Sequence, residues 1–289
     1  MEDIRPNDKF HMSQDYLKWS GGVTELNVPT RVVREQKIRV VIKNLLDYLI
    51  YKCSQEGRSE IYMSIETFQN LIRIDTDLNT YRELVQGKSP KLYKESRLKS
   101  QFILDTLDEL ISSSKFNYIK GDAKKGKYIM LFPEIAYDLE TCGYIKFTLN
   151  KDFVDTVSPK KKYNPKYLVD GMILNSVYSK NLHSFIYYYL DVFQSQKFSK
   201  NKPYNMTTFD QIEQYVGIRY NKVANKYDKE TKCYPKSKVV DILRDCVNQI
   251  NEKTRIVSEI GELDFEVIYG KHNGKAVSLG VRFFFKEVQ

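Results

Sequence analysis

The sequence has few of the residues that build metal sites, disulfide frameworks or membrane spans. It holds three histidines that lie far apart, and its four cysteines, none in a Cys-x-x-Cys pair, are Cys53, Cys142, Cys233 and Cys246. Metal ligands come in closer sets, so we expect no zinc site and no other cofactor. The lack of a signal peptide and of an apolar run of about 18 residues predicts a cytoplasmic protein with reduced thiols.

The composition is that of a folded chain with a basic surface. Apolar residues make up 42% and charged residues 29% of the 289 residues, which is too apolar for a disordered chain. The formal net charge of +9 favours an anionic partner, with nucleic acid first and an acidic membrane surface second. Because the lysines gather in loops and at helix starts instead of along one amphipathic helix, we expect no membrane partner.

The order of the predicted elements repeats along the chain. Each half reads as an amphipathic helix, a short capped helix, a basic stretch, a second amphipathic helix and a β-hairpin. A shift of 144 positions places TTFDQIEQYVGI beneath MSIETFQNLIRI, so that Thr208 matches Ser64 as a helix N-cap. This pattern indicates an internal duplication.

We predict an α+β fold, mainly helical, made of tandem winged helix-turn-helix domains. The segment SPKKKYNPK is basic and holds two prolines, which is typical of a linker. The expected parts are a flexible N-terminal arm (1–28), a first winged-helix domain for a protein interface or auxiliary DNA contact (29–157), the linker (158–166) and a second winged-helix domain as main DNA reader (167–289).

Both predicted hairpins have polar, lysine-bearing tips. The first is FNYIK, GDAKKGK and YIMLF, and the second is LDFEVIY, GKHNGK and AVSLGVRFFFK. Asn273-Gly274 predicts a two-residue type I′ turn. In the last strand, alternation predicts one buried face formed by Val277, Leu279, Val281, Phe283 and Phe285.

The helix predicted from Ser237 to Glu252 is the main candidate for reading bases. Its inner face consists of Val239, Leu243, Cys246, Val247 and Ile250. Its outer face carries side chains that pair with base edges, such as Arg with guanine and Asn with adenine. The predicted base readers are Ser237, Lys238, Asp241, Arg244, Asp245 and Asn248. An ordinary solvated face is the alternative, and the adjacent basic stretch favours DNA.

The corresponding helix of the first half, from about Ser96 to Ser112, has an acidic outer face. Its expected inner residues are Phe102, Ile103, Leu107, Leu110 and Ile111. Its expected outer residues are Arg97, Gln101, Asp105, Asp108 and Glu109. Acids repel phosphates, so DNA contact is expected mainly at its N-terminal end, through Lys94, Arg97 and Gln101. Two roles stay open for this half, a protein interface or a weaker DNA contact.

Phosphate contacts are expected from loops, helix starts and hairpin tips. The predicted set is Lys91, Lys94, Arg97, Gln101, Lys124, Lys125, Lys127, Arg219, Lys222, Lys226, Lys236, Lys271, Asn273 and Lys275.

No catalytic centre is predicted. The segment from Gly121 to Tyr128 comes within one residue of a Walker A loop, but Tyr128 cannot replace the small hydroxyl that binds Mg²⁺. No pair of carboxylates is marked by its spacing. We therefore predict that the protein is not an enzyme.

Three stretches together resemble the iteron-binding plasmid replication initiators, the Rep family built from two winged-helix domains. REQKIRVVIKNLLDYL is similar to the family's opening helix, and IMLFPEIAYDLETCGYIKFTLN to the segment that closes its first domain. The third is the strongest and matches a Ser-x-Tyr-Ser helix, an Ile-Asn-x-x-Thr helix end and a Gly-[KR]-x-Val strand. The matching positions are Ser176, Tyr178, Ser179, Ile250, Asn251, Thr254, Gly274, Lys275 and Val277.

The resemblance implies a bacterial protein associated with plasmid DNA. Such a protein binds direct repeats in double-stranded DNA at the origin, promotes origin opening and recruits the host replication initiator and replicative helicase. The resemblance also implies a homodimer, joined through the first domain, that represses its own gene. The alternative is a transcription regulator or phage DNA-binding protein on the same fold. Tandem repeats beside the gene favour initiation, and a single palindrome favours regulation.

Overall fold

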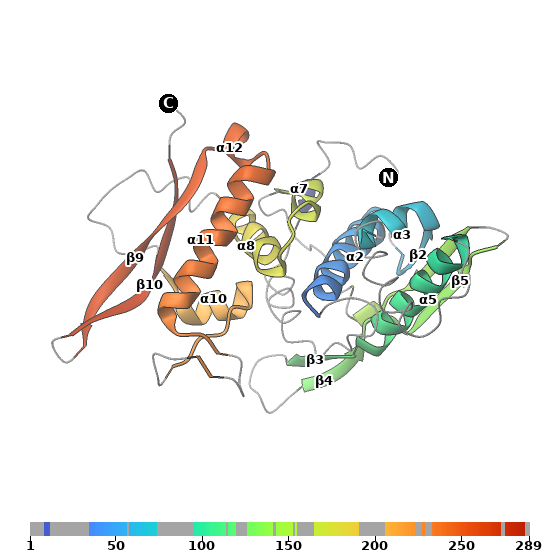
Figure 1. Ribbon diagram of the computed structural model, residues 1–289, viewed down its shortest axis with the longest axis horizontal. Coiled ribbons are helices and arrows are strands. Elements are labelled where there is room, and N and C mark those ends of the chain that lie inside the picture. The colour runs from blue at the N-terminus through green and yellow to red at the C-terminus, as the bar shows by residue number, and fades with distance from the viewer. Residues whose placement is uncertain are drawn as a thin grey trace. The chain divides into compact units, whose positions relative to one another are not determined.

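The computed structural model describes the chain as two compact units (Figure 1). Unit 1 is Met1–Arg5 with Leu26–Ser158, and unit 2 is Pro6–Glu25 with Pro159–Gln289. The residues that the structure describes are 9–11, 35–56, 58–73, 95–113, 115–119, 126–140, 143–152, 154, 165–190, 206–222, 227–228, 233–272 and 275–286.

The described residues of unit 1 form helices and two small antiparallel sheets. Its helices are α2 (Glu35–Glu56), α3 (Ile65–Ile72) and α5 (Glu95–Ser113). Its strands are β2 (Glu60–Ser64), β3 (Lys115–Ile119), β4 (Gly126–Met130), β5 (Glu134–Asp138) and β6 (Tyr144–Thr148). One sheet has the order β2-β6-β5, and β3 and β4 form a separate hairpin.

Unit 2 follows a similar order, and its strands β8, β10 and β9 form a three-stranded sheet in the order β8-β10-β9. Its helices are α7 (Leu168–Met172), α8 (Val177–Tyr188), α10 (Phe209–Val216), α11 (Lys236–Lys253) and α12 (Ile256–Glu259). Its strands are β7 (Pro165–Tyr167), β8 (Thr207–Thr208), β9 (Glu262–His272) and β10 (Lys275–Lys286). The predicted α+β fold is confirmed.

The short helices α3 and α10 are capped alike, as the alignment of Ser64 with Thr208 predicts. The Ser64 side chain accepts a hydrogen bond from the Thr67 backbone N–H, and the Thr208 side chain accepts one from Gln211. Both helices end on a left-handed residue, Arg73 (φ 52°) in unit 1 and Gly217 (φ 82°) in unit 2. The duplication therefore extends to backbone conformation.

The central helices of the two units share a Lys-Asn pair that the sequence patterns missed. Asn44 Nδ2 donates to the Leu71 carbonyl (3.3 Å) at the end of α3, and Asn181 Nδ2 donates to the Val216 carbonyl (3.1 Å) at the end of α10. In each unit the buried amide thus satisfies a terminal carbonyl of the short helix.

The lysines that precede these asparagines are fully buried, and their partners differ. Lys43 Nζ lies 2.6 Å from the Asp47 carboxylate. Lys180 Nζ donates to the carbonyls of Gly171 and Met172 (3.0 Å to Met172) at the end of α7. Unit 1 uses an ion pair in its core where unit 2 uses a cation on helix-end carbonyls.

The pairing of β2 changes which hairpin of unit 1 occupies the wing position. In unit 2, β8 pairs with β10, the second strand of the β9–β10 hairpin. In unit 1, β2 pairs with β6 and not with the predicted wing strand β4. The β5–β6 hairpin therefore corresponds in topology to β9–β10, and β3–β4 is an additional hairpin.

The β9–β10 hairpin, called the wing below, contains a bulge that breaks the predicted alternation. Its register pairs Lys275 with His272 and shifts between Ser278 and Gly280. Asn273 and Gly274, predicted to form the type I′ turn between the strands, lie outside the described residues. A bulge re-aims the side chains around it. Leu279, expected to be buried, is accordingly 47% exposed, whereas Val281 and Phe283 are buried.

Parts of the predicted arm and linker form a small sheet in unit 2. β1 (Lys9–His11), within the segment expected to be a flexible arm, pairs antiparallel with β7. The first two residues of β7, Pro165 and Lys166, belong to the segment expected to be the linker. The rest of that segment, 158–164, lies outside the described residues.

Candidate nucleic-acid interface

Helix α11 has the two faces that its sequence predicts. No glycine or proline interrupts its 18 residues, and Pro235 precedes it in an extended conformation. The confirmed buried residues are Val239, Leu243, Cys246, Val247 and Ile250. The exposed residues include all six predicted base readers, Ser237, Lys238, Asp241, Arg244, Asp245 and Asn248. The helix is therefore fixed on one side and presents polar chemistry on the other.

The Ile-Asn-x-x-Thr motif holds the end of α11 in place. The Asn251 side chain forms two hydrogen bonds with the backbone of Leu263 in β9, donating to its carbonyl (2.8 Å) and accepting from its N–H (3.0 Å). Thr254 Oγ1 donates to the Ile250 carbonyl (2.8 Å) and accepts from the Ile256 N–H (3.3 Å). The motif therefore joins the candidate reading helix rigidly to the wing.

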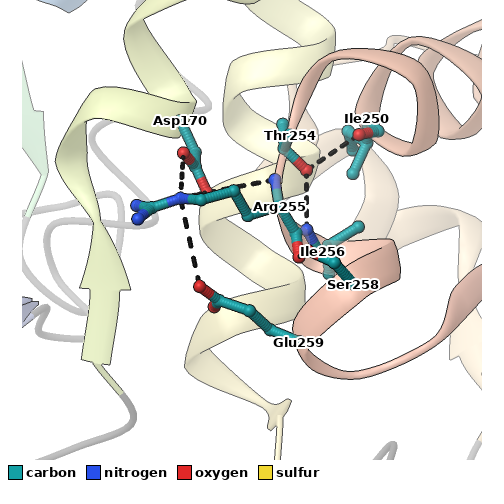
Figure 2. A network of polar contacts seen from close by, with 7 residues as sticks. All are labelled: Asp170, Ile250, Thr254, Arg255, Ile256, Ser258 and Glu259. Atoms are coloured by element: carbon teal, nitrogen blue, oxygen red, sulfur yellow. Dashed lines mark hydrogen bonds and ion pairs between the residues drawn. The ribbon is translucent and has the colours of Figure 1, made fainter. Parts of the chain in front are cut away.

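A second anchor lies one residue further on (Figure 2). Arg255 Nε lies 3.1 Å from Oδ1 of Asp170, a buried residue of α7, and the Arg255 backbone N–H also donates to this carboxylate. Glu259 of α12 lies 4.0 Å from the same Nε. Because a buried carboxylate needs a charged partner, this pair ties the α11–α12 corner to α7.

The outward face of α11 is largely free of partners within unit 2. Across the described parts of the chain, the side chains of Ser237, Lys238, Asp241 and Asn248 have no hydrogen bond or ion pair. The Arg244 guanidinium lies 5.9 Å from the centroid of the Phe265 ring in β9. These donors and acceptors are available to a ligand.

A hollow of about 550 Å³ lies between the start of α11 and the wing. Ser237 and Asp241 line it from α11, and Tyr269 and Ser278 line it from the wing. Tyr269 is 67% exposed and was not among the predicted site residues. The alternation of side chains along β9 could have indicated Tyr269, because residues four apart lie on the same face of a strand and Tyr269 therefore shares a face with Phe265.

Two of the predicted phosphate contacts are occupied inside unit 2. Lys236 Nζ donates to the Ser278 carbonyl (3.0 Å). Lys222 Nζ lies 2.8 Å from Asp210 Oδ1, and this hydrogen bond raises the pKa of Lys222 and lowers that of Asp210. Burial, followed by the hydrogen bond to Asp210, raises the pKa of Tyr220 to about 12.

The other predicted phosphate contacts are only partly described. Lys271 is exposed near the tip of the wing, and Arg219 is half-buried. Lys127 in β4 and Lys275 in β10 have a placed backbone only. The residues that lie outside the described part of the chain are Lys91, Lys94, Lys124, Lys125, Lys226 and Asn273.

The outer face of α5 differs from its prediction at two positions. Arg97 and Gln101 are exposed as expected, and Gln101 Nε2 donates to Asp105 (2.9 Å). Glu109, expected to face outward, is buried, whereas Ile111, expected to face inward, is 38% exposed. On an ideal helix Glu109 lies on the same face as the buried Phe102 and Thr106, and Ile111 lies opposite Phe102, so the prediction placed these two residues on the wrong faces. The burial of Glu109 reduces the acidity of the outer face.

The described residues contain neither a candidate metal cluster nor a candidate membrane span. No cluster of three or more His, Cys, Asp or Glu residues there could hold a metal ion. None of the helices described is long and apolar enough to span a bilayer.

The chain resembles a solved DNA-binding protein over its whole length. No family model matches it, and no curated protein matches it either. Among solved structures it is similar to the crystal structure of the Pi initiator protein in complex with iteron DNA, at 17% sequence identity and a TM-score of 0.55. The match covers 99% of this chain and 100% of the other. The resemblance to replication initiators inferred from sequence motifs therefore extends to the fold, which this chain shares from end to end with that initiator.

Proposed function

We propose that the protein is a plasmid replication initiator that binds repeated sites in double-stranded DNA. The end-to-end match in fold with an initiator crystallised on iteron DNA is the observation that carries this proposal. The exposed polar face of α11 and the net charge of +9 support it. The proposed activity is binding, without catalytic chemistry or a cofactor.

In the proposed mechanism, unit 2 reads the sequence. An α-helix fits the major groove of B-DNA, where a bidentate arginine or asparagine distinguishes one base pair from another. Arg244 and Asn248 lie on the exposed face of α11 and supply these groups. Lys271 neutralises phosphates, and we assign the same role to Lys238, which the sequence placed among the base readers; both contribute affinity that does not depend on sequence. The wing, with Tyr269 beside the hollow, lies along the flanking groove.

Further steps belong to the proposal through the family resemblance. Bound at direct repeats, the protein promotes origin opening and recruits the host initiator and replicative helicase. As a homodimer joined through unit 1, it represses its own gene.

Footprinting on the DNA that flanks the gene tests the proposed function. We expect protection of tandem direct repeats of about one to two helical turns each, since both units of one chain contact successive grooves. Protection of a single palindrome would instead identify a transcription regulator. Metal-dependent nicking of a supercoiled substrate, or no protection, would contradict the proposal.

A further inference from the structure

The ammonium group of Lys236 lies where three elements of unit 2 meet. Lys236 is the first residue of α11, and its Nζ donates to the carbonyl of Ser278 in β10 at 3.0 Å. The same Nζ lies 5.1 Å from the centroid of the Phe209 ring at the start of α10 and 5.7 Å from that of Tyr220. One half-buried cation thus contacts the candidate reading helix, the short helix and the wing.

The carbonyl that Lys236 binds is at the irregular point of the wing. The register of β10 shifts between Ser278 and Gly280, and a bulge locally disrupts the ladder. Gly280 is pressed against β8, because a Cβ there would lie 2.3 Å from the Thr207 carbonyl oxygen. The wing is thus attached to the rest of unit 2 at Ser278 and at Gly280, and from there to its tip it continues as a two-stranded ribbon. The contact at Ser278 therefore sets the direction of the wing.

The two aromatic rings near the Lys236 ammonium, those of Phe209 and Tyr220, are held in place by contacts of their own. The ring centroids of Phe209 and Tyr220 are 5.5 Å apart, and the Tyr220 hydroxyl donates to Asp210 (2.9 Å). Lys222 lies over the Tyr220 ring at 5.5 Å and also binds Asp210. A cation over an aromatic face is attracted by the ring's quadrupole, most strongly where water is partly excluded.

We propose that Lys236 is a positioning residue that fixes the wing against α11, and that it does not contact phosphate. The hydrogen bond to the Ser278 carbonyl and the proximity of both rings hold its ammonium within unit 2. Lys238, two residues along the helix, is exposed and has no polar partner in the described part of the chain, which suits a phosphate contact. This inference rests on the proposed DNA-binding function.

The salt dependence of binding separates the two roles. The variants are Lys236→Met, which keeps the alkyl chain and removes the charge, and the matched Lys238→Met. The probes are the duplex that the unchanged chain selects from a randomised pool and a duplex of random sequence. A lost phosphate contact lowers the slope of log K against log salt concentration by about 0.9 and weakens both duplexes alike.

We expect Lys236→Met to weaken the selected duplex several-fold, to leave the random duplex and the slope unchanged, and to lose protection at the flank nearest the wing. Lys238→Met should lower the slope. A fall of about 0.9 in the slope for Lys236→Met would overturn the inference, because it identifies a phosphate contact.

Amide hydrogen exchange on the free protein tests the inference without DNA. Lys236→Met should speed amide exchange across Ser278–Val281 roughly tenfold, because local opening controls the exchange rate. The amides of α11 that lie far from β8 should exchange at an unchanged rate. Lys236→Arg keeps a cation over the rings and should restore most of the protection. Unchanged exchange in Lys236→Met would overturn the inference. Failure of the unchanged chain to select any sequence would instead contradict the proposed function.

Discussion

The two units share their order of elements and differ in what their second long helices present. In unit 2, α11 exposes lysine, arginine, asparagine and aspartate side chains beside a wing and a hollow. In unit 1, α5 exposes Arg97 and Gln101 in its first turns, followed by a face with Asp108 and the apolar Ile111. One scaffold therefore occurs twice, and the chemistry for reading bases is concentrated in one copy.

This comparison shows that the scaffold and the site are separable. The N-caps at Ser64 and Thr208 and the buried amides of Asn44 and Asn181 recur because each short helix needs its ends satisfied. The exposed faces of α5 and α11 carry no such requirement and have diverged. Paired substitutions at corresponding positions can test how far the correspondence extends.

The largest expected effect is in the buried lysines. Lys43→Met leaves the buried Asp47 carboxylate without its lysine and should lower the free energy of unfolding of unit 1 by about 3 to 5 kcal/mol. Lys180→Met removes the donor to the neutral carbonyls of Gly171 and Met172 and should lower the free energy of unfolding of unit 2 by about 1 to 3 kcal/mol. Equal losses would contradict the difference between the two cores.

Two buried thiols provide the readout for each unit. Burial raises the pKa of Cys53 in α2 to about 11 and that of Cys246 in α11 to about 12, so both stay protonated at neutral pH. The thiolate is the reactive form, so alkylation should require opening of the surrounding unit. Peptide-resolved alkylation along a urea series then reports the unfolding of each unit separately. The double variant Lys43→Met/Asp47→Leu should recover part of the stability lost in Lys43→Met, because it also removes the buried carboxylate.

The next comparison concerns exposed arginines on the two long helices. Arg244→Ala should cost about 1 to 3 kcal/mol against the preferred base at one position and relax specificity there. Arg97→Ala should weaken all duplexes alike and lower the salt slope by about 0.9. Binding measurements on duplexes mutated one base pair at a time decide this. A changed base preference in Arg97→Ala, and not in Arg244→Ala, would contradict the assignment of base reading to α11.

The hairpins in the wing position carry exposed tyrosines that should behave differently. Tyr269 lines the hollow beside α11, whereas Tyr137 is 50% exposed on β5 of unit 1. Tyr269→Ala should cost about 1 kcal/mol of binding free energy because an aromatic anchor is lost. Tyr137→Ala should leave DNA binding unchanged. Titrations of both variants with the same duplex check this. A larger loss of affinity in Tyr137→Ala than in Tyr269→Ala would indicate that unit 1 is the main reader.

The smallest expected effect is at the helix C-caps. Gly217 and Arg73 both have positive φ, a conformation that costs a residue with a Cβ about 1 kcal/mol. Gly217→Ala should therefore destabilise unit 2 by about 1 kcal/mol, and Arg73→Gly should stabilise unit 1 by about 0.5 kcal/mol. Urea unfolding checks both signs. A destabilised Arg73→Gly would show that the arginine side chain outweighs its backbone strain.

Local patterns in the sequence predicted most elements and the two faces of α11. Periodicity of 3.6 residues separated buried Leu243 from exposed Arg244, and cap residues marked the starts of α3 and α10. The exposure of Leu279 was missed because a period of two cannot show a bulge, although Gly280 within the strand was a usable signal.

Features that depend on distant neighbours were not predictable. The pairing of β2 with β6 joins residues about eighty positions apart, and nothing in either strand names its partner. Lysine is rarely buried completely, and no pattern in the sequence marks Lys43 and Lys180 as buried residues with partners. For the same reason, composition could not distinguish the engaged Lys236 from the available Lys238.

Selection of duplexes from a randomised pool by two multiple variants tests the central claim most directly. In one, the six outward residues of α11 are replaced by alanine: Ser237, Lys238, Asp241, Arg244, Asp245 and Asn248. In the other, Arg97, Gln101 and Asp108 of α5 are replaced. We predict that the α11 variant recovers no shared sequence while the α5 variant recovers the sequence that the unchanged chain selects. The same selected sequence from the α11 variant would contradict the assignment of base reading to unit 2.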